Sequence, residues 1–208
     1  MPYFPNRKIV QVSIPRTSSM SASISLGMTG DFDPVRLWGW AGPIEMTHMT
    51  AMEILSSIGK RNFEECVRFT IVRNPFDRLV SEYHYRQSGD ARIISVVGKT
   101  FLEFARELDK RWEEIRGSSQ TARCHFIPQV DFICDPSGNS LVKILRFEDR
   151  PSVSEFLVSL GASDIQHANR SVRSGYRSYY DDESRGIVEK RYAQDFDFLG
   201  YERECYGG

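Results

Sequence analysis

The stretch IVQVSIPRTSSMSASIS, residues 9–25, decides the fold that the sequence predicts. Its first part, residues 9–14, is rich in β-branched side chains and predicts a buried strand. Pro15 ends that strand, because proline has no N–H to donate to a sheet ladder. A helix is expected to begin near Met20, with Thr17 or Ser18 as its N-cap.

The turn between this strand and this helix has the chemistry of an anion site. It combines one arginine with several hydroxyls, namely Arg16, Thr17, Ser18, Ser19 and Ser21. The N-terminus of a helix adds N–H groups and the positive end of the helix dipole. Phosphate or sulfate oxygens suit such a turn, and an ordinary turn with a surface arginine is the alternative. The G-x-x-x-x-G-K-[ST] pattern of nucleoside triphosphatases is absent from the stretch.

A second strand, turn and helix repeat this arrangement. Residues 67–72 predict a buried strand, the turn Arg73-Asn74-Pro75 ends it, and residues 76–85 predict a helix that Asn74 caps. Ligands of open α/β sheets bind at the carboxyl ends of the strands. Arg73 and Ser81 could therefore share one anion there. Two such units side by side would bind a ligand with two separated anionic groups.

The segment between these two units contains further candidate site residues. Thr47 is expected to cap a helix over residues 48–58 that ends at Gly59. His48 would then lie in the first turn, where the positive end of the dipole favours a neutral, base-competent imidazole. A histidine that only makes local hydrogen bonds is the alternative. The Trp38 and Trp40 rings lie in a predicted loop, where packing is favoured over stacking on a sugar or base.

The rest of the chain predicts helices and short strands. The expected elements are a helix over 101–115, a loop or edge strand at 125–129, a hairpin of strands 130–133 and 141–145 around a turn at 135–139, a helix over 152–160 before Gly161, a basic and aromatic loop at 169–180, and a helix over 182–196. Arg170, Arg173 and Arg177 of that basic loop are available to anions.

Composition limits the class of protein. The 208 residues suit one domain, residues 1–208, and 40% hydrophobic and 26% charged residues are ordinary for a globular chain. The net charge of −1 does not suggest nucleic acid or another polyanion as a partner. No run is long enough to span a membrane and no signal-peptide core is recognisable, so we expect a cytoplasmic protein or an excised domain with no membrane partner. The oligomeric state stays open, with a dimer among the alternatives.

The four cysteines lack the pattern of a metal site. They show no C-x-x-C pair, so a zinc site is not expected. Reduced thiols are the default interpretation, with a bridge between Cys124 and Cys134 as the alternative.

Separate stretches of the chain resemble the sulfotransferases that use 3′-phosphoadenosine 5′-phosphosulfate (PAPS), and among them the carbohydrate (type 2) branch. IPRTSSMSAS is similar to the family's 5′-phosphosulfate loop, and IVRNPFDRLVSEY is similar to its 3′-phosphate motif. HFIPQ resembles the His-x-x-Pro-Gln element of the carbohydrate branch. ILRFEDRPSVSEFLVSLG and YAQDFDFLGY resemble the strand–helix and C-terminal segments of the family.

This resemblance implies a fold and a reaction. The fold would be a three-layer, P-loop-like α/β fold in which helices flank a central, mainly parallel sheet. PAPS would be the co-substrate, adenosine 3′,5′-bisphosphate the product, and no metal would be required. The acceptor would be an alcohol, with a saccharide hydroxyl favoured, although a small lipid or polyketide alcohol fits equally well.

The resemblance also implies roles for individual residues. The residues expected beside the 5′-phosphosulfate are Arg16, Thr17, Ser18, Ser19, Met20 and Ser21. Arg73 and Ser81 match the pair that binds the 3′-phosphate. His48 would be the general base, with Glu45 as the alternative base. Residues in weaker correspondence are Trp38, Trp40 and His125 near the acceptor, and Asn169, Arg170 and Arg173 in a loop over the nucleotide.

One departure from the family pattern keeps alternatives open. Arg16 stands where the family has a lysine, and arginine offers a planar fork with a fixed charge that does not donate its proton in any ordinary sense. A non-catalytic relative that only binds the nucleotide is therefore one alternative. A nucleotide or sugar kinase on a similar sheet is another, which the missing Gly-Lys-[ST] pattern disfavours.

Overall fold

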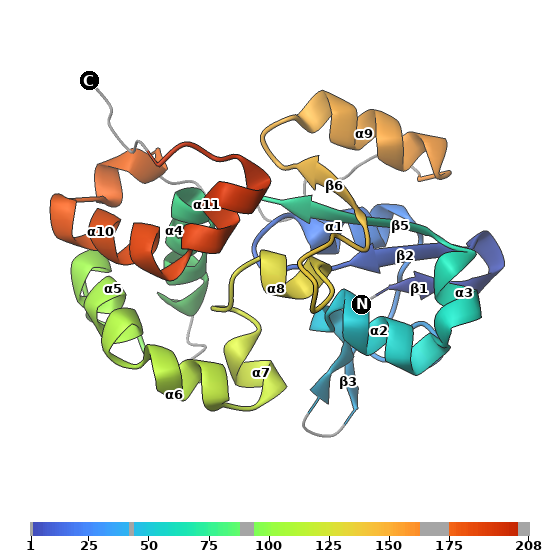
Figure 1. Ribbon diagram of the computed structural model, residues 1–208, viewed down its shortest axis with the longest axis horizontal. Helices are drawn as coiled ribbons and strands as arrows, with labels where there is room; N and C mark the ends of the chain where they lie inside the picture. The colour runs from blue at the N-terminus through green and yellow to red at the C-terminus, as the bar shows by residue number, and fades with distance from the viewer. Residues whose placement is uncertain (1, 42–43, 88–93, 163–174, 204–208) are drawn as a thin grey trace. The chain divides into compact units, whose positions relative to one another are not determined.

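The computed structural model describes residues 2–41, 44–87, 94–162 and 175–203. The contacts among these residues divide the chain into two compact units, which we describe separately. Unit 1 is drawn from residues 1–73 and 129–169, and unit 2 from residues 74–128 and 170–208. Figure 1 labels the main helices and strands of both units.

Unit 1 is built on a mainly parallel sheet. The described strands lie in the order β1 (Tyr3–Phe4), β2 (Ile9–Val12), β5 (Val67–Val72) and β6 (Lys143–Arg146) (Figure 1). Strand β1 is antiparallel to β2, whereas the β2–β5 and β5–β6 pairs are parallel. The two apolar runs of the sequence therefore form neighbouring parallel strands, which confirms the predicted sheet.

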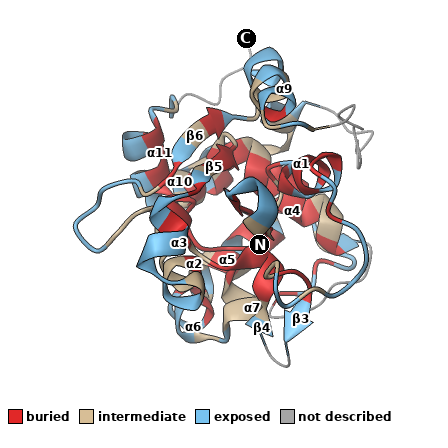
Figure 2. Cartoon of the chain, turned by 90° about the vertical axis from the view of Figure 1, so that its right-hand side faces the viewer, coloured by how far each residue is buried: buried red, intermediate tan, exposed pale blue. Residues whose placement is uncertain are grey.

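Two helices, α1 (Ser19–Ser25) and α9 (Arg150–Ser159), share an apolar cluster with this sheet. The edge of the Phe69 ring on β5 meets the Phe156 ring on α9 at 5.2 Å between centroids. The buried members of the cluster are Phe4, Ile9, Ala22, Leu26, Met28, Trp38, Phe69, Ile71, Leu145 and Leu157. Figure 2 shows α1 mainly buried and α9 mainly exposed. The helix predicted at 152–160 is thus confirmed as α9, which Asp149 caps by accepting a hydrogen bond from the Ser152 N–H.

The other elements of unit 1 are short. They are η1 (Pro5–Arg7), β3 (Trp40–Ala41), β4 (Ile44–Glu45), η2 (Met46–His48), α2 (Ala51–Ile58), α3 (Lys60–Glu64) and α8 (Val130–Ile133). Strands β3 and β4 pair as an antiparallel hairpin. Figure 1 shows α2 and α8 on the side of the sheet opposite to α9.

The helix predicted to start at His48 starts later, at Ala51. Thr50 is its N-cap and forms a capping box with Glu53, in which each residue's N–H is bound by the side chain of the other. Thr47 is not the cap, because its hydroxyl accepts a hydrogen bond from the Gly39 N–H instead. His48 therefore lies in a preceding 3-10 turn, and the prediction that it occupies the first turn of α2 is wrong.

The hairpin predicted around residues 135–139 forms only in part, as an isolated antiparallel bridge between Cys134 and Ser140. The turn itself forms, since the Asp135 N–H donates to the Asn139 carbonyl at 2.9 Å. Residues 130–133, however, form the single-turn helix α8, and β6 pairs with β5. A short buried apolar run suits a strand and a helix equally, so the pattern could not separate the two.

Unit 2 consists of helices. They are α4 (Pro75–Gln87), α5 (Phe101–Lys110), α6 (Trp112–Gly117), α7 (Gln120–Arg123), η3 (Tyr176–Tyr179), α10 (Asp182–Arg191) and α11 (Ala193–Leu199). The predicted cap of α4 is confirmed, because the Phe76 N–H donates to the Asn74 side chain at 2.9 Å. Residues 125–129 form a loop, which is one of the two predicted alternatives.

Two long helices predicted for unit 2 are each broken once. The helix predicted over 101–115 bends at Arg111, and the one predicted over 182–196 bends at Tyr192. Both residues have ψ angles above 0°, which takes the backbone out of the helical region. The first bend precedes Trp112 and the second lies at Tyr192, and the side chains of both aromatic residues are buried in the core.

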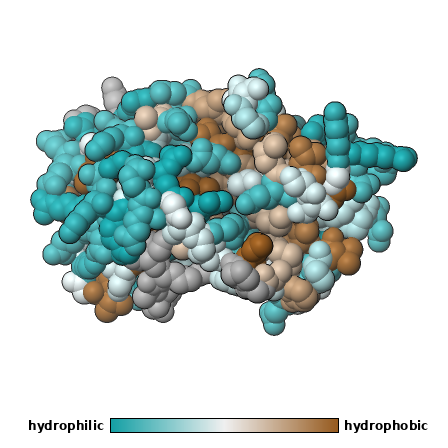
Figure 3. All heavy atoms as spheres, turned by 60° about the horizontal axis from the view of Figure 1, so that its bottom comes forward, coloured by the Kyte–Doolittle hydropathy of each residue, from teal (hydrophilic) through white to brown (hydrophobic). Residues whose placement is uncertain are grey.

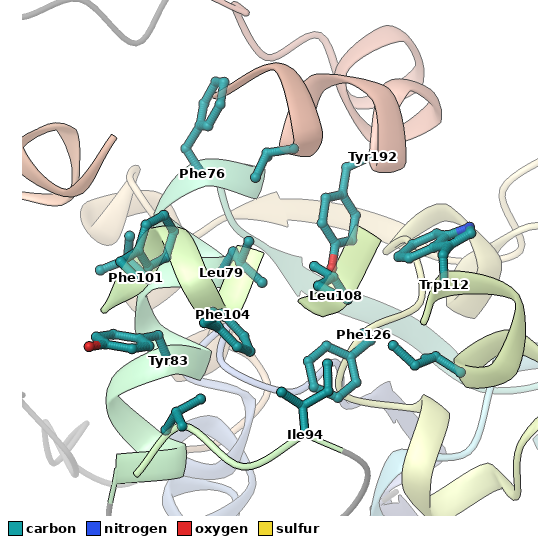
Figure 4. Packing of buried hydrophobic residues seen from close by; sticks show 14 of the residues in the cluster. Phe76, Leu79, Tyr83, Ile94, Phe101, Phe104, Leu108, Trp112, Phe126 and Tyr192 are labelled. Carbon is teal, nitrogen blue, oxygen red and sulfur yellow. The ribbon is translucent and has the colours of Figure 1, made fainter. Parts of the chain in front are cut away.

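Aromatic rings dominate the core of unit 2 (Figure 4). Phe76 contacts Tyr180 and Phe196 at 5.0 Å between ring centroids. Tyr83 meets Phe101 at 5.6 Å with perpendicular rings, a favourable edge-to-face geometry. Polar residues cover the outside, and Figure 3 shows mainly hydrophilic side chains on the side where α5 and α6 lie in Figure 1.

Two further sequence expectations concern the cysteines and the membrane. Among the described residues, none of the helices combines the length and apolar character needed to cross a membrane. Cys66, Cys124 and Cys134 form no disulfide within the part of the chain that the structure describes. The reduced state of these cysteines stays a prediction, and Cys205 lies outside the described residues.

We predict that Phe104→Ala destabilises unit 2. The Phe104 side chain is fully buried on α5, so its removal leaves a cavity and should lower the free energy of unfolding by about 3–5 kcal/mol. Urea denaturation followed by circular dichroism measures this loss. Phe198→Ala on α11, where the side chain is 45% exposed, is the matched control and should change stability by less than about 1 kcal/mol. Equal losses in the two variants would contradict the assigned core.

Candidate functional site

The turn between β2 and α1 is shaped by its own hydroxyls. The Thr17 and Ser19 side chains both donate to the Ile14 carbonyl, at 2.9 and 2.8 Å. Arg16 and Ser18 adopt positive φ angles of 69° and 66°, which bend the backbone sharply. Ser18 occupies the N-cap position of α1, but within the described residues its side chain makes no capping hydrogen bond. The Thr17 and Ser19 hydroxyls thus hold the turn together, a role that the sequence did not predict.

Gln11 ties this turn to the sheet. Its amide nitrogen donates to the Ser19 carbonyl at 2.7 Å, and the Ser23 hydroxyl donates to its amide oxygen at 3.2 Å. The Gln11 side chain is fully buried. The first turns of α1 are therefore fixed on β2. Of the residues expected at the anion, Ser21 is buried on α1, whereas Ser18 and Met20 are exposed.

Arg73 lies at the carboxyl end of β5 and reaches the turn that follows β2. Its guanidinium donates to the Arg16 carbonyl at 3.0 Å and lies over the Phe147 ring, 4.2 Å from the ring centroid. Arg150 lies over the same ring at 5.1 Å. The structure therefore brings together Arg16 and Arg73, the two basic residues that the sequence placed at separate turns. The guanidinium groups of Arg73 and Arg150 over Phe147 make this edge of the sheet suitable for an anionic ligand.

The backbone of Arg73 is held by a residue that the sequence analysis assigned no role. The Gln129 side chain accepts from the Arg73 N–H at 2.8 Å and donates to the Arg73 carbonyl at 2.7 Å. Gln129 is fully buried at the start of α8. The signal that could have found it is the HFIPQ element, which ends on this glutamine.

His48, which is buried, and Glu45, which is partly buried, form a pair in unit 1. The Nδ1 atom of His48 lies 2.7 Å from the Ser13 carbonyl oxygen, just past the end of β2. A carbonyl can only accept, so Nδ1 carries a proton, and Nε2 is the ring atom that can take up or release one. Nε2 faces the Glu45 carboxylate at 3.6 Å. The two alternative bases of the sequence analysis are therefore neighbours, and Nε2 is the proton-accepting atom of the histidine.

His125 belongs to a buried ionic network in unit 2. Its Nδ1 lies 2.9 Å from one carboxylate oxygen of Glu82, and Arg86 donates to the other at 2.6 Å. The Glu82 and Arg86 side chains are each 1% exposed. Arg78 binds the carbonyls of His125 and Ile127. The network therefore fixes both the histidine ring and the loop that carries it.

The remaining candidate residues are spread over both units. Ser81 is buried on α4 of unit 2. Trp38 packs in the core of unit 1, where its indole N–H donates to the Gly30 carbonyl at 2.8 Å. Trp40 is 47% exposed on the β3–β4 hairpin. Asn169, Arg170 and Arg173 lie outside the described residues.

A groove of about 640 Å³ runs between β6 and α9 in unit 1. Its charged lining residues are Lys143, Arg146, Asp149 and Glu155. Because the two positive and the two negative side chains cancel, the groove attracts an anion less strongly than the turn of Arg16 and Arg73 does. The basic edge at β2 and β5 is therefore the better candidate for a phosphate or sulfate group.

Comparison with known proteins identifies one family. The model described as "Sulfotransferase family" matches residues 43–202, which is most of the chain. The match includes the segments that carry Glu45, His48, Arg73, Ser81 and Gln129. No curated protein and no solved structure matches the chain.

We predict that Glu82→Ala destabilises unit 2 more than loss of a surface ion pair does. Removing Glu82 leaves the Arg86 charge buried, which should lower the free energy of unfolding by about 3–5 kcal/mol. Glu114→Ala, which breaks the exposed pair with Arg111, is the control and should cost about 0–1 kcal/mol. Urea titration of each variant gives both values. A loss below 1 kcal/mol for Glu82→Ala would show that the network does not stabilise the fold.

Proposed function

Because the chain belongs to the sulfotransferase family, that of the carbohydrate sulfotransferases, we propose that it transfers a sulfuryl group from PAPS to an acceptor hydroxyl. The family match itself supports sulfuryl transfer. The nucleotide donor, the saccharide acceptor and the general base are parts of the proposal. We further propose that the two units work together as a single sulfotransferase domain, since the match covers segments of both.

The observation that carries the proposal is the contact between Arg73 and the turn of Arg16. PAPS presents a 5′-phosphosulfate and a 3′-phosphate, so its binding needs two separate anion sites. The guanidinium of Arg73 lies 3.0 Å from the Arg16 carbonyl, which supports two such sites at neighbouring turns of one sheet edge. In the proposal Arg16 and the turn through Ser21 hold the 5′-phosphosulfate, while Arg73 and Ser81 hold the 3′-phosphate. Arg170 and Arg173 are proposed to contact the nucleotide as well.

The proposed chemistry is an in-line displacement at sulfur. The acceptor oxygen attacks the sulfuryl group, a new S–O bond forms, and the bond from sulfur to the bridging phosphate oxygen breaks. The hydroxyl proton passes to Nε2 of His48, and the electron pair leaves with adenosine 3′,5′-bisphosphate. Arg16 stabilises the charge that develops on the departing phosphate, an electrostatic effect that is usually large. The reaction as written needs no metal.

The surroundings of His48 support its role as the base. The Ser13 carbonyl holds the Nδ1 proton, so the ring presents Nε2 as an acceptor without changing tautomer. When Nε2 takes the proton, the Glu45 carboxylate at 3.6 Å stabilises the positive ring that results. In this proposal Glu45 therefore assists the base instead of replacing it.

A saccharide hydroxyl is the proposed acceptor, on the strength of the family match. Trp40 is exposed and offers a ring on which a sugar could stack, and His125 remains a candidate for the acceptor side. Trp38 is assigned to packing because its side chain is buried in the core.

We expect adenosine 3′,5′-bisphosphate, the product of the proposed reaction, to bind the wild-type protein in calorimetric titration. Arg73→Ala should weaken this binding about 10- to 100-fold, since it removes a charged hydrogen-bond donor from a phosphate. Arg111→Ala removes a charge that is paired with Glu114 in unit 2 and should leave the affinity within about twofold. Binding of ATP with magnesium in place of the bisphosphate would refute the donor assignment and favour a kinase.

We expect His48→Asn to lower kcat about 10²- to 10⁴-fold on an acceptor found by screening saccharides with radiolabelled PAPS. The wild-type rate should rise with pH as the base loses its proton, and this rise should vanish in the variant. Glu45→Gln should lower kcat by a smaller factor and keep the rise. If Glu45→Gln abolishes the rise instead, Glu45 is the base. Tight bisphosphate binding without turnover on any acceptor would favour a non-catalytic relative.

A further inference from the structure

We propose that Gln129 is a positioning residue for the 3′-phosphate site, through its clamp on the backbone of Arg73. This inference rests on the proposed function, in which Arg73 binds that phosphate. Gln129 itself need not touch the nucleotide. Its proposed effect is to fix the direction in which the Arg73 side chain leaves the sheet.

The Gln129 clamp takes the place of a neighbouring strand just past the end of β5. On one side of the end of β5, the Phe147 N–H donates to the Val72 carbonyl at 2.7 Å, which continues the pairing with β6. One residue later, the Gln129 amide bonds both backbone polar groups of Arg73, at 2.8 and 2.7 Å. A neighbouring β-strand would satisfy the N–H and the carbonyl of one residue in the same way. Arg73 is therefore held as firmly as a residue within the sheet.

The clamp determines where the guanidinium lies. With its backbone fixed, the Arg73 side chain crosses to the Arg16 carbonyl at 3.0 Å and packs on Phe147 at 4.2 Å. An arginine has many rotamers, and ordering such a side chain costs conformational entropy. The clamp fixes the backbone and the Phe147 ring supports the guanidinium before a ligand binds. Both therefore reduce the entropy cost of ordering Arg73 when phosphate binds. Loss of the clamp would thus leave the charge present but less well ordered.

Only a glutamine meets the chemical needs of this position. One amide supplies both the acceptor for the N–H and the donor for the carbonyl. A glutamate would accept from the N–H but would place a negative charge against the carbonyl. Methionine has a similar length and offers neither bond, so Gln129→Met removes the clamp with little change in volume. The side chain is fully buried, so bulk solvent does not reach the two bonds.

The test compares two nucleotides that differ only at the 3′ position. Calorimetry of Gln129→Met should show adenosine 3′,5′-bisphosphate binding weakened about tenfold, with adenosine 5′-phosphate binding within about twofold of wild type. In turnover assays the KM for PAPS should rise while kcat stays near the wild-type value. A general loss of folding would weaken the binding of both nucleotides. Equal losses for the two nucleotides, or no loss for the bisphosphate, would overturn the proposal.

Gln11→Met is the matched comparison. Gln11 is another fully buried glutamine of unit 1, but its amide holds the first turn of α1 instead of Arg73. Its loss should weaken both nucleotides together, because they share the 5′-phosphate. If Gln129→Met behaves like Gln11→Met, the 3′-specific role is refuted.

Amide hydrogen exchange of Arg73 separates the clamp from the proposed function. Exchange should be at least about tenfold faster in Gln129→Met than in the wild type, whether or not a nucleotide binds. Unchanged exchange would overturn the clamp. Faster exchange in a protein whose wild type binds no bisphosphate would support the clamp and refute the donor assignment, together with the phosphate role proposed for Gln129.

Discussion

The parallel pairing of β2 with β5 is the constraint on which the candidate site depends. Parallel strands end at the same edge, so the turns that follow them become neighbours. Here each turn carries an arginine, and like charges repel. The guanidinium of Arg73 bonds to the main-chain carbonyl of Arg16, a neutral acceptor at the neighbouring turn. With Arg150 over the same Phe147 ring as Arg73, two positive groups lie at one edge of a chain whose net charge is only −1.

Unit 2 also contains charged groups, which lie next to its aromatic core. Glu82 and Arg86 lie beside the aromatic cluster at 1% exposure, where isolated charges would be costly. Their mutual bond and the bond to His125 satisfy them, and Arg86 also lies over the Phe126 ring at 4.4 Å. Burial raises the pKa of the nearby Tyr192 phenol, which therefore stays neutral among these charges. The loop at residues 125–129 is thus specified by side chains far from it in the sequence.

Local signals were enough to predict much of the fold and part of the site. The β-branched runs that became β2 and β5 and the cap Asn74 have strong signatures within a few residues. The helix–strand choice at residues 130–133 failed because a four-residue apolar run has no distinguishing period. The bond between Gln129 and Arg73 spans 56 residues, and no local pattern encodes a partner at that distance. The same holds for the Ser13 carbonyl, which selects the tautomer of His48.

The turn after β2 also shows a conflict between stability and activity. Arg16 and Ser18 both adopt the left-handed backbone region, which is unfavourable for residues with a Cβ by roughly 1–2 kcal/mol each. Glycine would relieve that strain, but at Arg16 it would also remove the positive charge. The chain therefore keeps a strained backbone where the candidate chemistry lies. The packing of the strands behind the turn offsets the free-energy cost of that strain. Engineering this protein for heat resistance would need to leave that turn alone and seek its gains elsewhere.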